Sequence, residues 1–193
     1  MNLGGEYLTE NELKNYGFRR LGKNIKIHNR ASVYGVENIS LGDHVRIDDF
    51  TIIIATGPLE IGHYVSIPNF CFIGAKYGLV MEDFVTLAPG VKIFTSSDDY
   101  SGEFLSGPIV PPEMTGGKKG KVTLGKHVLI GAGSVVLPAC ALGEGCSVGA
   151  LSLVNKDLEP WGVYAGVPAI RLKDRRQDML EWEKKLKEQG NGY

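Results

Sequence analysis

The sequence lacks an apolar run long enough to cross a bilayer, and its first residues, MNLGGEYLTENELKNYG, lack the apolar core of a secretion signal. It also lacks a basic excess, because 21 lysines and arginines stand against 22 acidic residues. That balance argues against a nucleic-acid-binding protein. We therefore expect a soluble protein of one domain, with no membrane span and no nucleic-acid partner.

Neither the 3.6-residue spacing of an amphipathic helix nor the two-residue alternation of a half-buried strand dominates the chain. Aliphatic residues instead recur every six positions, and this period is nested in one of twenty. Twelve positions follow the pattern: Leu21, Ile27, Val33, Leu41, Ile47, Ile53, Ile61, Ile67, Ile73, Met81, Leu87 and Ile93. Such a repeat is typical of a parallel β-helix, in which each hexapeptide forms one side of a triangular coil.

Three hexapeptides account for eighteen of the twenty residues in each rung. We place the two remaining residues at one corner of the rung. The repeat later resumes in rungs of eighteen, at Leu124, Ile130, Val136, Leu142, Val148 and Val154. Met81 and Leu124 lie 43 positions apart, 25 more than one such rung. We expect these residues to form an excursion loop at the corner that carries the extra pair. Corner insertions leave the stack undisturbed and often bind ligands.

The three cysteines all occupy one position of the hexapeptide, four residues after an aliphatic residue. Small side chains at this position are expected to point into the coil. Cys71, Cys140 and Cys146 are therefore predicted to be buried free thiols that pack as small hydrophobes. Free thiols favour a reducing compartment, so we expect the protein in the cytoplasm.

Both ends of the chain depart from the repeat. Residues 9–16 begin with a Thr-x-x-Glu capping box and predict a short helix over the first rung. Residues 173–189 predict a second helix with solvated Lys and Glu residues and an apolar stripe of Met179, Leu180, Trp182 and Leu186. The expected organisation is one domain, with a cap (1–20), coils (21–97 and 122–158), a loop (98–121) and a C-terminal segment with its helix (159–193).

The rungs, the loop and the closing segment SLVNKDLEPWGVYAGVPAIR, residues 152–171, resemble the hexapeptide-repeat acyltransferases. The resemblance covers about residues 20 to 175 and is strongest to the galactoside, maltose and lipopolysaccharide sugar O-acetyltransferases. It implies an all-β solenoid, a left-handed parallel β-helix, which is an exception to right-handed crossover. It also implies a homotrimer with its sites between subunits, and acetyl-coenzyme A as acyl donor.

The resemblance further implies residues that bind the donor. Small side chains would let the pantetheine arm approach the backbone, although any coil also needs small residues at its turns. The matching positions are Gly131, Ala132, Gly149 and Ala150 for the arm, Asn155 and Lys156 for the adenine end, and Arg171 for phosphate.

At the catalytic position this sequence departs from the acyltransferases that it resembles. Those enzymes carry a histidine where their chain leaves the coil for the excursion loop. Asp98 stands there instead, followed by Asp99 and Tyr100, and the two aspartates are the candidate catalytic residues. A carboxylate, with an ordinary pKa of about 4, is a weaker base than histidine, although a neighbouring carboxylate would raise that pKa. Asp98 is therefore the base, or it positions an amine acceptor, or the reaction is lost. Asn69 and Tyr100 are the expected contacts to the acceptor.

Three functions remain at this point. Transfer of an acetyl group to a sugar hydroxyl is our first expectation, and N-acylation of a nucleotide-linked amino deoxysugar is the alternative. A non-catalytic structural solenoid is disfavoured by the long loop. The zinc-dependent carbonic anhydrases with this coil need three converging histidines. The four histidines here (His28, His44, His63 and His127) differ in register, so we expect no metal.

Overall fold

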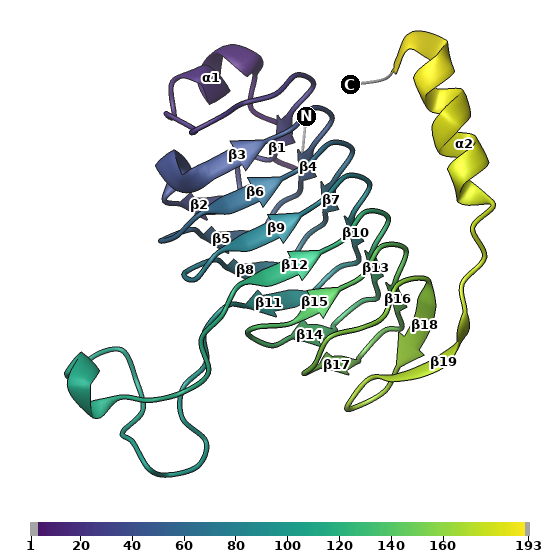
Figure 1. Ribbon diagram of the computed structural model, residues 1–193. Coiled ribbons are helices and arrows are strands. Elements are labelled where there is room, and N and C mark those ends of the chain that lie inside the picture. The colour runs from purple at the N-terminus through teal and green to yellow at the C-terminus, as the bar shows by residue number, and fades with distance from the viewer. Residues whose placement is uncertain (1–3, 192–193) are drawn as a thin grey trace.

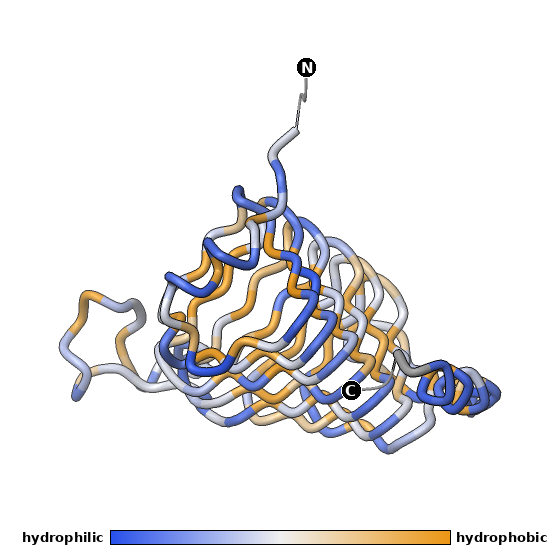
Figure 2. The backbone as a smooth tube through the Cα atoms, turned by 90° about the horizontal axis from the view of Figure 1, so that it is seen from above, coloured by the Kyte–Doolittle hydropathy of each residue, from blue (hydrophilic) through white to orange (hydrophobic). Residues whose placement is uncertain are grey.

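The computed structural model describes residues 4–191, which wind into a coil of three-sided rungs (Figure 1). The triangular outline is visible along the coil axis, with the excursion loop and the C-terminal helix projecting on opposite sides (Figure 2). Strands of successive rungs pair in parallel. The fold is therefore the all-β parallel solenoid that the repeat predicts.

Three sheets form the faces of the coil. The first face contains β1 (Lys26–Ile27), β4 (Arg46–Ile47), β7 (Ser66–Ile67), β10 (Thr86–Leu87), β13 (Leu129–Ile130), β16 (Ser147–Val148), β18 (Gly162–Ala165) and β19 (Ile170–Asp174). The second contains β2 (Ser32–Tyr34), β5 (Ile52–Ile54), β8 (Phe72–Gly74), β11 (Lys92–Phe94), β14 (Val135–Val136) and β17 (Leu153–Val154). The third contains β3 (Ile39–Leu41), β6 (Leu59–Ile61), β9 (Leu79–Met81), β12 (Val122–Leu124) and β15 (Ala141–Leu142).

The pairing register follows the periods of the sequence. Ile53 pairs with Ile73, twenty residues later, and Leu124 pairs with Leu142, eighteen residues later. Across the loop, Met81 pairs with Leu124. The loop therefore leaves and returns at one corner without shifting the stack. This is the 2–3 corner, between the second and third faces, where the earlier rungs carry their two extra residues. A 3-10 helix at Val36–Asn38 fills it in the first rung.

The core is the column of aliphatic side chains that the repeat predicts. All twelve positions are buried except Leu21 and Val33 in the first rung, which are partly buried against the same cluster. Cys71, Cys140 and Cys146 are buried free thiols, as predicted. Burial raises the pKa of the Cys71 thiol to about 11 and also raises the pKa values of the other two. These cysteines therefore behave as inert core residues.

The N-terminal helix α1 (Glu10–Lys14) forms as predicted and lies over the first rung (Figure 1). The Thr9 amide donates to the Glu12 carboxylate at 2.7 Å, and the Glu12 amide donates back to the Thr9 hydroxyl at 3.3 Å. This capping box satisfies amides that the first turn leaves without partners. Leu13 turns inward and is 1% exposed, so the helix closes the N-terminal end of the core.

The C-terminal helix is shorter than predicted. Residues 170–174 form β19, which pairs antiparallel with β18, and helix α2 begins only at Met179 and ends at Leu186. A π-helical turn at Lys187–Asn191 follows it. Trp182 of the predicted apolar stripe is 69% exposed. No helix among residues 4–191 is long and apolar enough to span a membrane.

The prediction that the charged residues of this helix are simply solvated is wrong for Glu183. Its side chain is 9% exposed, and its carboxylate accepts hydrogen bonds from Lys126 at 2.5 Å and His127 at 2.8 Å. Lys187 lies 2.9 Å from the same carboxylate. Burial alone would raise the pKa of Glu183, but hydrogen bonds from Lys126, Lys187 and His127 outweigh it and lower the pKa to about 2. A buried ionic contact therefore holds α2 on the coil.

His127 also belongs to a column of stacked rings on the corner between the third and first faces. Successive ring centres lie 4.5 Å apart from His44 to Tyr64, 5.1 Å to Phe84 and 5.0 Å to His127. Each of these residues has a positive φ, so its side chain points outward from a tight turn. Stacking gives these turns contacts from rung to rung, and it places His127 where Glu183 reaches it.

Candidate active site

The excursion loop has a short antiparallel neck at the 2–3 corner. The Ser97 amide donates to the Lys118 carbonyl at 2.9 Å, and the Gly120 amide donates to the Thr95 carbonyl at 3.0 Å. Gly117 sits inside this neck with φ of +112°, and a Cβ there would lie 2.0 Å from the Ser97 carbonyl oxygen. Only glycine fits at this point, so the chain around Asp98 is held tightly.

Thr95, at the root of the loop, was not singled out by the sequence pattern. Its buried hydroxyl accepts hydrogen bonds from the amides of Lys76 at 2.8 Å and Tyr77 at 3.0 Å, and donates to the Gly74 carbonyl at 2.8 Å. These three bonds tie the loop root to the corner of the preceding rung. No repeat signals them, because the pattern reports aliphatic spacing and not single hydroxyl contacts.

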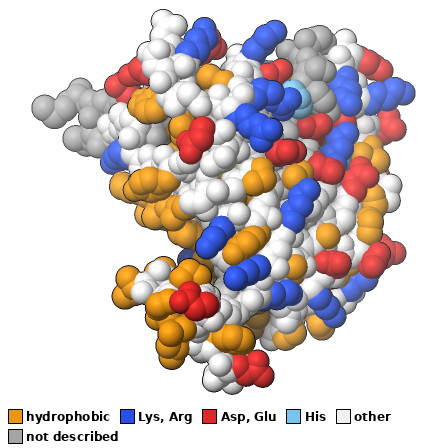
Figure 3. Space-filling model, turned by 60° about the vertical axis from the view of Figure 1, so that its left-hand side comes forward, with side chains coloured by type: hydrophobic (Ala, Val, Ile, Leu, Met, Phe, Trp, Pro, Cys, Tyr) orange, Lys and Arg blue, Asp and Glu red, His pale blue; other side chains and the backbone are white. Residues whose placement is uncertain are grey.

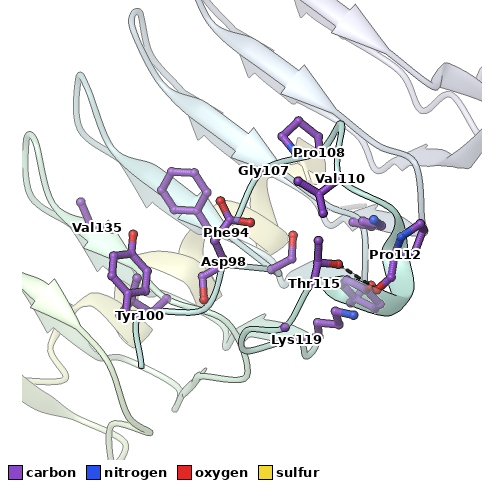
Figure 4. A pocket seen from close by; sticks show the side chains of 16 residues that line it. Phe94, Asp98, Tyr100, Gly107, Pro108, Val110, Pro112, Thr115, Lys119 and Val135 are labelled. Carbon is purple, nitrogen blue, oxygen red and sulfur yellow. Dashed lines mark hydrogen bonds between the residues drawn. The ribbon is translucent and has the colours of Figure 1, made fainter. Parts of the chain in front are cut away.

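A pocket of about 900 Å³ lies between the loop and the second face of the coil. Figure 3 shows the hollow beside the loop, with hydrophobic side chains on both sides and basic side chains near it. Phe94 and Val135 form its floor, and the loop residues Asp98 and Tyr100 line it (Figure 4). Among the described residues that line it, Asp98 is the only acidic one and none is a histidine.

Asp99 does not line this pocket. Its carboxylate accepts hydrogen bonds from the Ser101 hydroxyl at 2.8 Å and from the amides of Ser101, Gly102 and Phe104 at 2.8 to 3.3 Å. The hydrogen bond from the Ser101 side chain is the main cause that lowers the pKa of Asp99. Asp99 therefore folds the loop around itself, and Asp98 is the carboxylate that faces the cavity.

Five other predicted residues lie far from Asp98 within one chain. They occupy the corner between the first and second faces, which we call the 1–2 corner: Asn69, Gly131, Ala132, Gly149 and Ala150. Between Gly90 at this corner and Ser96 at the 2–3 corner, six residues of extended chain span about 20 Å. The two groups of residues stand at opposite edges of the second face.

The coil itself explains one of these glycines. A Cβ on Gly131 would lie 2.4 Å from the Ala150 amide nitrogen in the next rung. Gly149 is less constrained, with Ala165 Cβ 3.0 Å away. The backbones of adjacent rungs therefore require Gly131, whether or not a ligand approaches it.

The remaining predicted residues lie toward the C-terminal end. Asn155 and Lys156 are exposed at the 2–3 corner, two rungs after the loop root. Arg171 lies on β19, where its guanidinium donates to the Tyr164 hydroxyl at 3.0 Å and to Asp174 at 2.8 Å. The Gly-Val-Pro-Ala segment forms the turn between β18 and β19 and contains a cis Val167–Pro168 bond. Within the described chain, no three His, Cys, Asp or Glu side chains gather as metal ligands would.

Comparison with known proteins identifies the family. The family model for the bacterial transferase hexapeptide (six repeats) matches residues 121–156. A dTDP-4-amino-4,6-dideoxy-D-glucose acyltransferase from Escherichia coli is 42% identical over 182 residues, which cover 94% of this chain and 95% of that protein. The chain belongs to the hexapeptide-repeat acyltransferases. It is therefore an enzyme of acyl transfer, and its coil is the left-handed β-helix of that family.

Solved structures of hexapeptide-repeat acyltransferases show the same architecture. AntD, an N-acyltransferase from Bacillus cereus, has been solved as an aspartate-to-alanine variant with dTDP and coenzyme A. It matches with a TM-score of 0.92 at 38% identity, over 96% of this chain and 99% of that one. WbbJ of Escherichia coli, a putative lipopolysaccharide biosynthesis O-acetyl transferase, is 29% identical over 82% of this chain and 80% of its own length. Relatives thus include N- and O-acyltransferases.

Proposed function

We propose that this enzyme transfers an acyl group from coenzyme A to the amino group of a dTDP-linked amino deoxysugar. The observation that carries the proposal is the group facing the pocket, which is the Asp98 carboxylate and not a histidine. A neutral amine attacks a thioester without a strong base, whereas a hydroxyl benefits from one. Similarity to a dTDP-amino-sugar acyltransferase over nearly the whole chain supports this choice.

The reaction balances with Asp98 as a positioning and charge-stabilising group. The amine nitrogen attacks the thioester carbonyl carbon, so a C–N bond forms and the C–S bond breaks. The nitrogen becomes positively charged during attack, and the carboxylate of Asp98 stabilises that charge in the pocket. The proton that the nitrogen loses matches the one that the departing coenzyme A thiolate takes up. Tyr100 is a proposed contact to the acceptor, and so is Asn69 from the 1–2 corner of a neighbouring subunit.

We propose that a second copy of the chain completes the donor site. Asn155 and Lys156 share the 2–3 corner with Asp98, while Gly149 and Ala150 lie at the opposite edge of the second face. A groove between two coils would bring the 1–2 corner of one subunit to the 2–3 corner of the next. Coenzyme A is a long molecule, and a groove of this kind would hold its pantetheine arm, with Arg171 available for phosphate.

We propose a homotrimer built on the second face. Its outward side chains are mainly apolar, with Ser32 and Lys92 as polar exceptions. Phe50 and Phe70 at its edge stack 5.5 Å apart while 47% and 59% exposed. Ile52 beside them is 40% exposed. Exposed apolar patches of this kind mark association surfaces. Sedimentation equilibrium is expected to give three times the 21.0 kDa chain mass, and a concentration-independent monomer would disprove the assembly.

The acceptor class is tested by measuring thiol release from acetyl-coenzyme A and from a longer acyl-coenzyme A with a panel of acceptors. We expect release with dTDP-4-amino-4,6-dideoxyglucose, and none with the matching dTDP-4-hydroxy sugar. The similarity to WbbJ supports a second candidate, transfer to a sugar hydroxyl, and release only with hydroxyl acceptors would establish it. If no acceptor in the panel gives release, neither substrate class is correct.

A further inference from the structure

Two lysines and a tyrosine form one wall of the pocket, away from Asp98 in the sequence. The Lys76 and Lys119 amino groups lie 5.6 and 5.9 Å from the centre of the Tyr77 ring. All three line the same cavity as Asp98. Lys76 and Tyr77 come from the rung before the loop, while Lys119 comes from the returning limb of the neck, where it bridges to Ser96.

The two amino groups are not neutralised by protein carboxylates. Within residues 4–191, no acidic oxygen lies within 4.0 Å of the Lys76 or Lys119 nitrogen. The cavity thus has two positive charges on one wall and one carboxylate on the loop. A ring contact at an exposed site stabilises a lysine by only about 0.5–1 kcal/mol, too little to be the sole reason for gathering two cations.

The wall is held in place relative to Asp98. The buried Thr95 hydroxyl binds the amides of both Lys76 and Tyr77, and Thr95 precedes Asp98 by three residues. The rungs after the loop close with eighteen residues and have no residues that correspond to Lys76 and Tyr77. The coil can therefore close without such a pair at this corner. The backbone amides of Lys76 and Tyr77 thus fix the pair beside the loop root, and their side chains are available to a ligand.

We propose that Lys76 and Lys119 bind the diphosphate of the nucleotide-linked acceptor, with Tyr77 orienting both amino groups. This inference rests on the proposed function, since it needs an acceptor with an anion at one end and an amine at the other. Lysine supplies a point charge that suits phosphate oxygens, and charge-assisted hydrogen bonds are the strong ones.

Position along the coil assigns these cations to the acceptor and not to coenzyme A. Lys76 and Tyr77 lie one rung before the loop root, whereas Asn155 and Lys156, the proposed donor contacts, lie two rungs after it. With rungs about 4.8 Å apart, donor and acceptor would approach Asp98 from opposite ends of the same corner. Such an arrangement brings the thioester and the amine together and keeps their phosphates apart.

The test uses the full chain with both lysines replaced, Lys76→Ala and Lys119→Ala, and calorimetric titration with dTDP, thymidine and coenzyme A. We expect the dissociation constant for dTDP to rise at least about 30-fold, because two charge-assisted contacts are lost. Thymidine, which has no phosphate, is expected to bind both proteins alike, and coenzyme A affinity is expected to stay within about twofold. Lys118→Ala, on the same limb but outside the pocket lining, is the matched control.

Other results would contradict the inference in distinct ways. Unchanged dTDP affinity in the double variant would exclude the diphosphate role, and selective loss of coenzyme A affinity would assign the cations to the donor. An unchanged thermal midpoint shows that the variant is folded, and restored dTDP affinity with Lys76→Arg and Lys119→Arg supports a charge effect. If the unmodified protein itself fails to bind dTDP, the nucleotide acceptor of the proposed function is wrong.

Discussion

Replacing Asp98 with asparagine is expected to lower turnover by about 100-fold, with coenzyme A affinity kept within about twofold. The variant keeps the size of the side chain and removes its charge, so the nitrogen that becomes positive during attack loses its stabilising partner. A hundredfold change corresponds to about 2.7 kcal/mol of transition-state stabilisation. Steady-state thiol release and calorimetry with coenzyme A measure the two quantities separately.

The matched control is Glu103→Gln, which removes another exposed carboxylate from the same loop outside the pocket lining. Its turnover is expected to stay near that of the unmodified enzyme. Raising the pH is expected to increase the rates of the unmodified enzyme and of Asp98→Asn by similar factors with an amine acceptor, because more of the amine is then neutral. Turnover that is unchanged by the Asp98 substitution would remove this residue from the reaction.

Replacing Glu183 with glutamine is expected to loosen α2 from the coil and to lower the free energy of its local opening by about 3 kcal/mol. The substitution leaves Lys126 and Lys187 facing a neutral partner, and removing one member of a buried ion pair is strongly destabilising. Hydrogen exchange of the amides in residues 179–186 measures the opening directly. Glu181→Gln, on an exposed position of the same helix, is the control and is expected to change little.

The same contact predicts a pH dependence. The pKa of Glu183 is lowered to about 2 in the folded protein, from an ordinary value of 4.5. A lowered carboxyl pKa contributes stability that is complete above the unfolded value and is lost as pH falls from about 4.5 to 2. The helix of the unmodified protein is therefore expected to open more readily across this range. If Glu183→Gln shows the same change in opening over that range, the carboxylate is not its cause.

The core could be predicted because burial in a β-helix depends on a residue's place in the hexapeptide. Ile67 and Met81 are buried for the same positional reason, and the rule also places Cys71 and the other two cysteines. The position of the loop followed from the same count, since the insertion interrupts the period without shifting it. The buried positions and the place of the loop can be read from the sequence because every rung repeats the same pattern of inward-facing residues.

Interactions that occur only once leave no such signal. Glu183 contacts His127 across 56 residues, and nothing in the helix pattern distinguishes it from the solvated glutamates around it. Strand β19 replaced the start of the predicted helix because its pairing with β18 outweighed the local helical pattern of residues 173 and 174. For Lys76 and Tyr77 a signal did exist, because they lie at the corner where a rung exceeds eighteen residues by two.

The neck of the loop has a consequence for how this enzyme could have diversified. The Thr95 carbonyl and the Gly120 amide meet at 3.0 Å, so the intervening segment begins and ends at almost one point. The entropy of closing a loop grows only with the logarithm of its length, and doubling it costs about 0.6 kcal/mol. An ancestor could therefore acquire, lengthen or exchange this segment at little cost to the stability of the coil. Changes in the loop that lines the pocket can then alter substrate choice while the stability of the coil is kept.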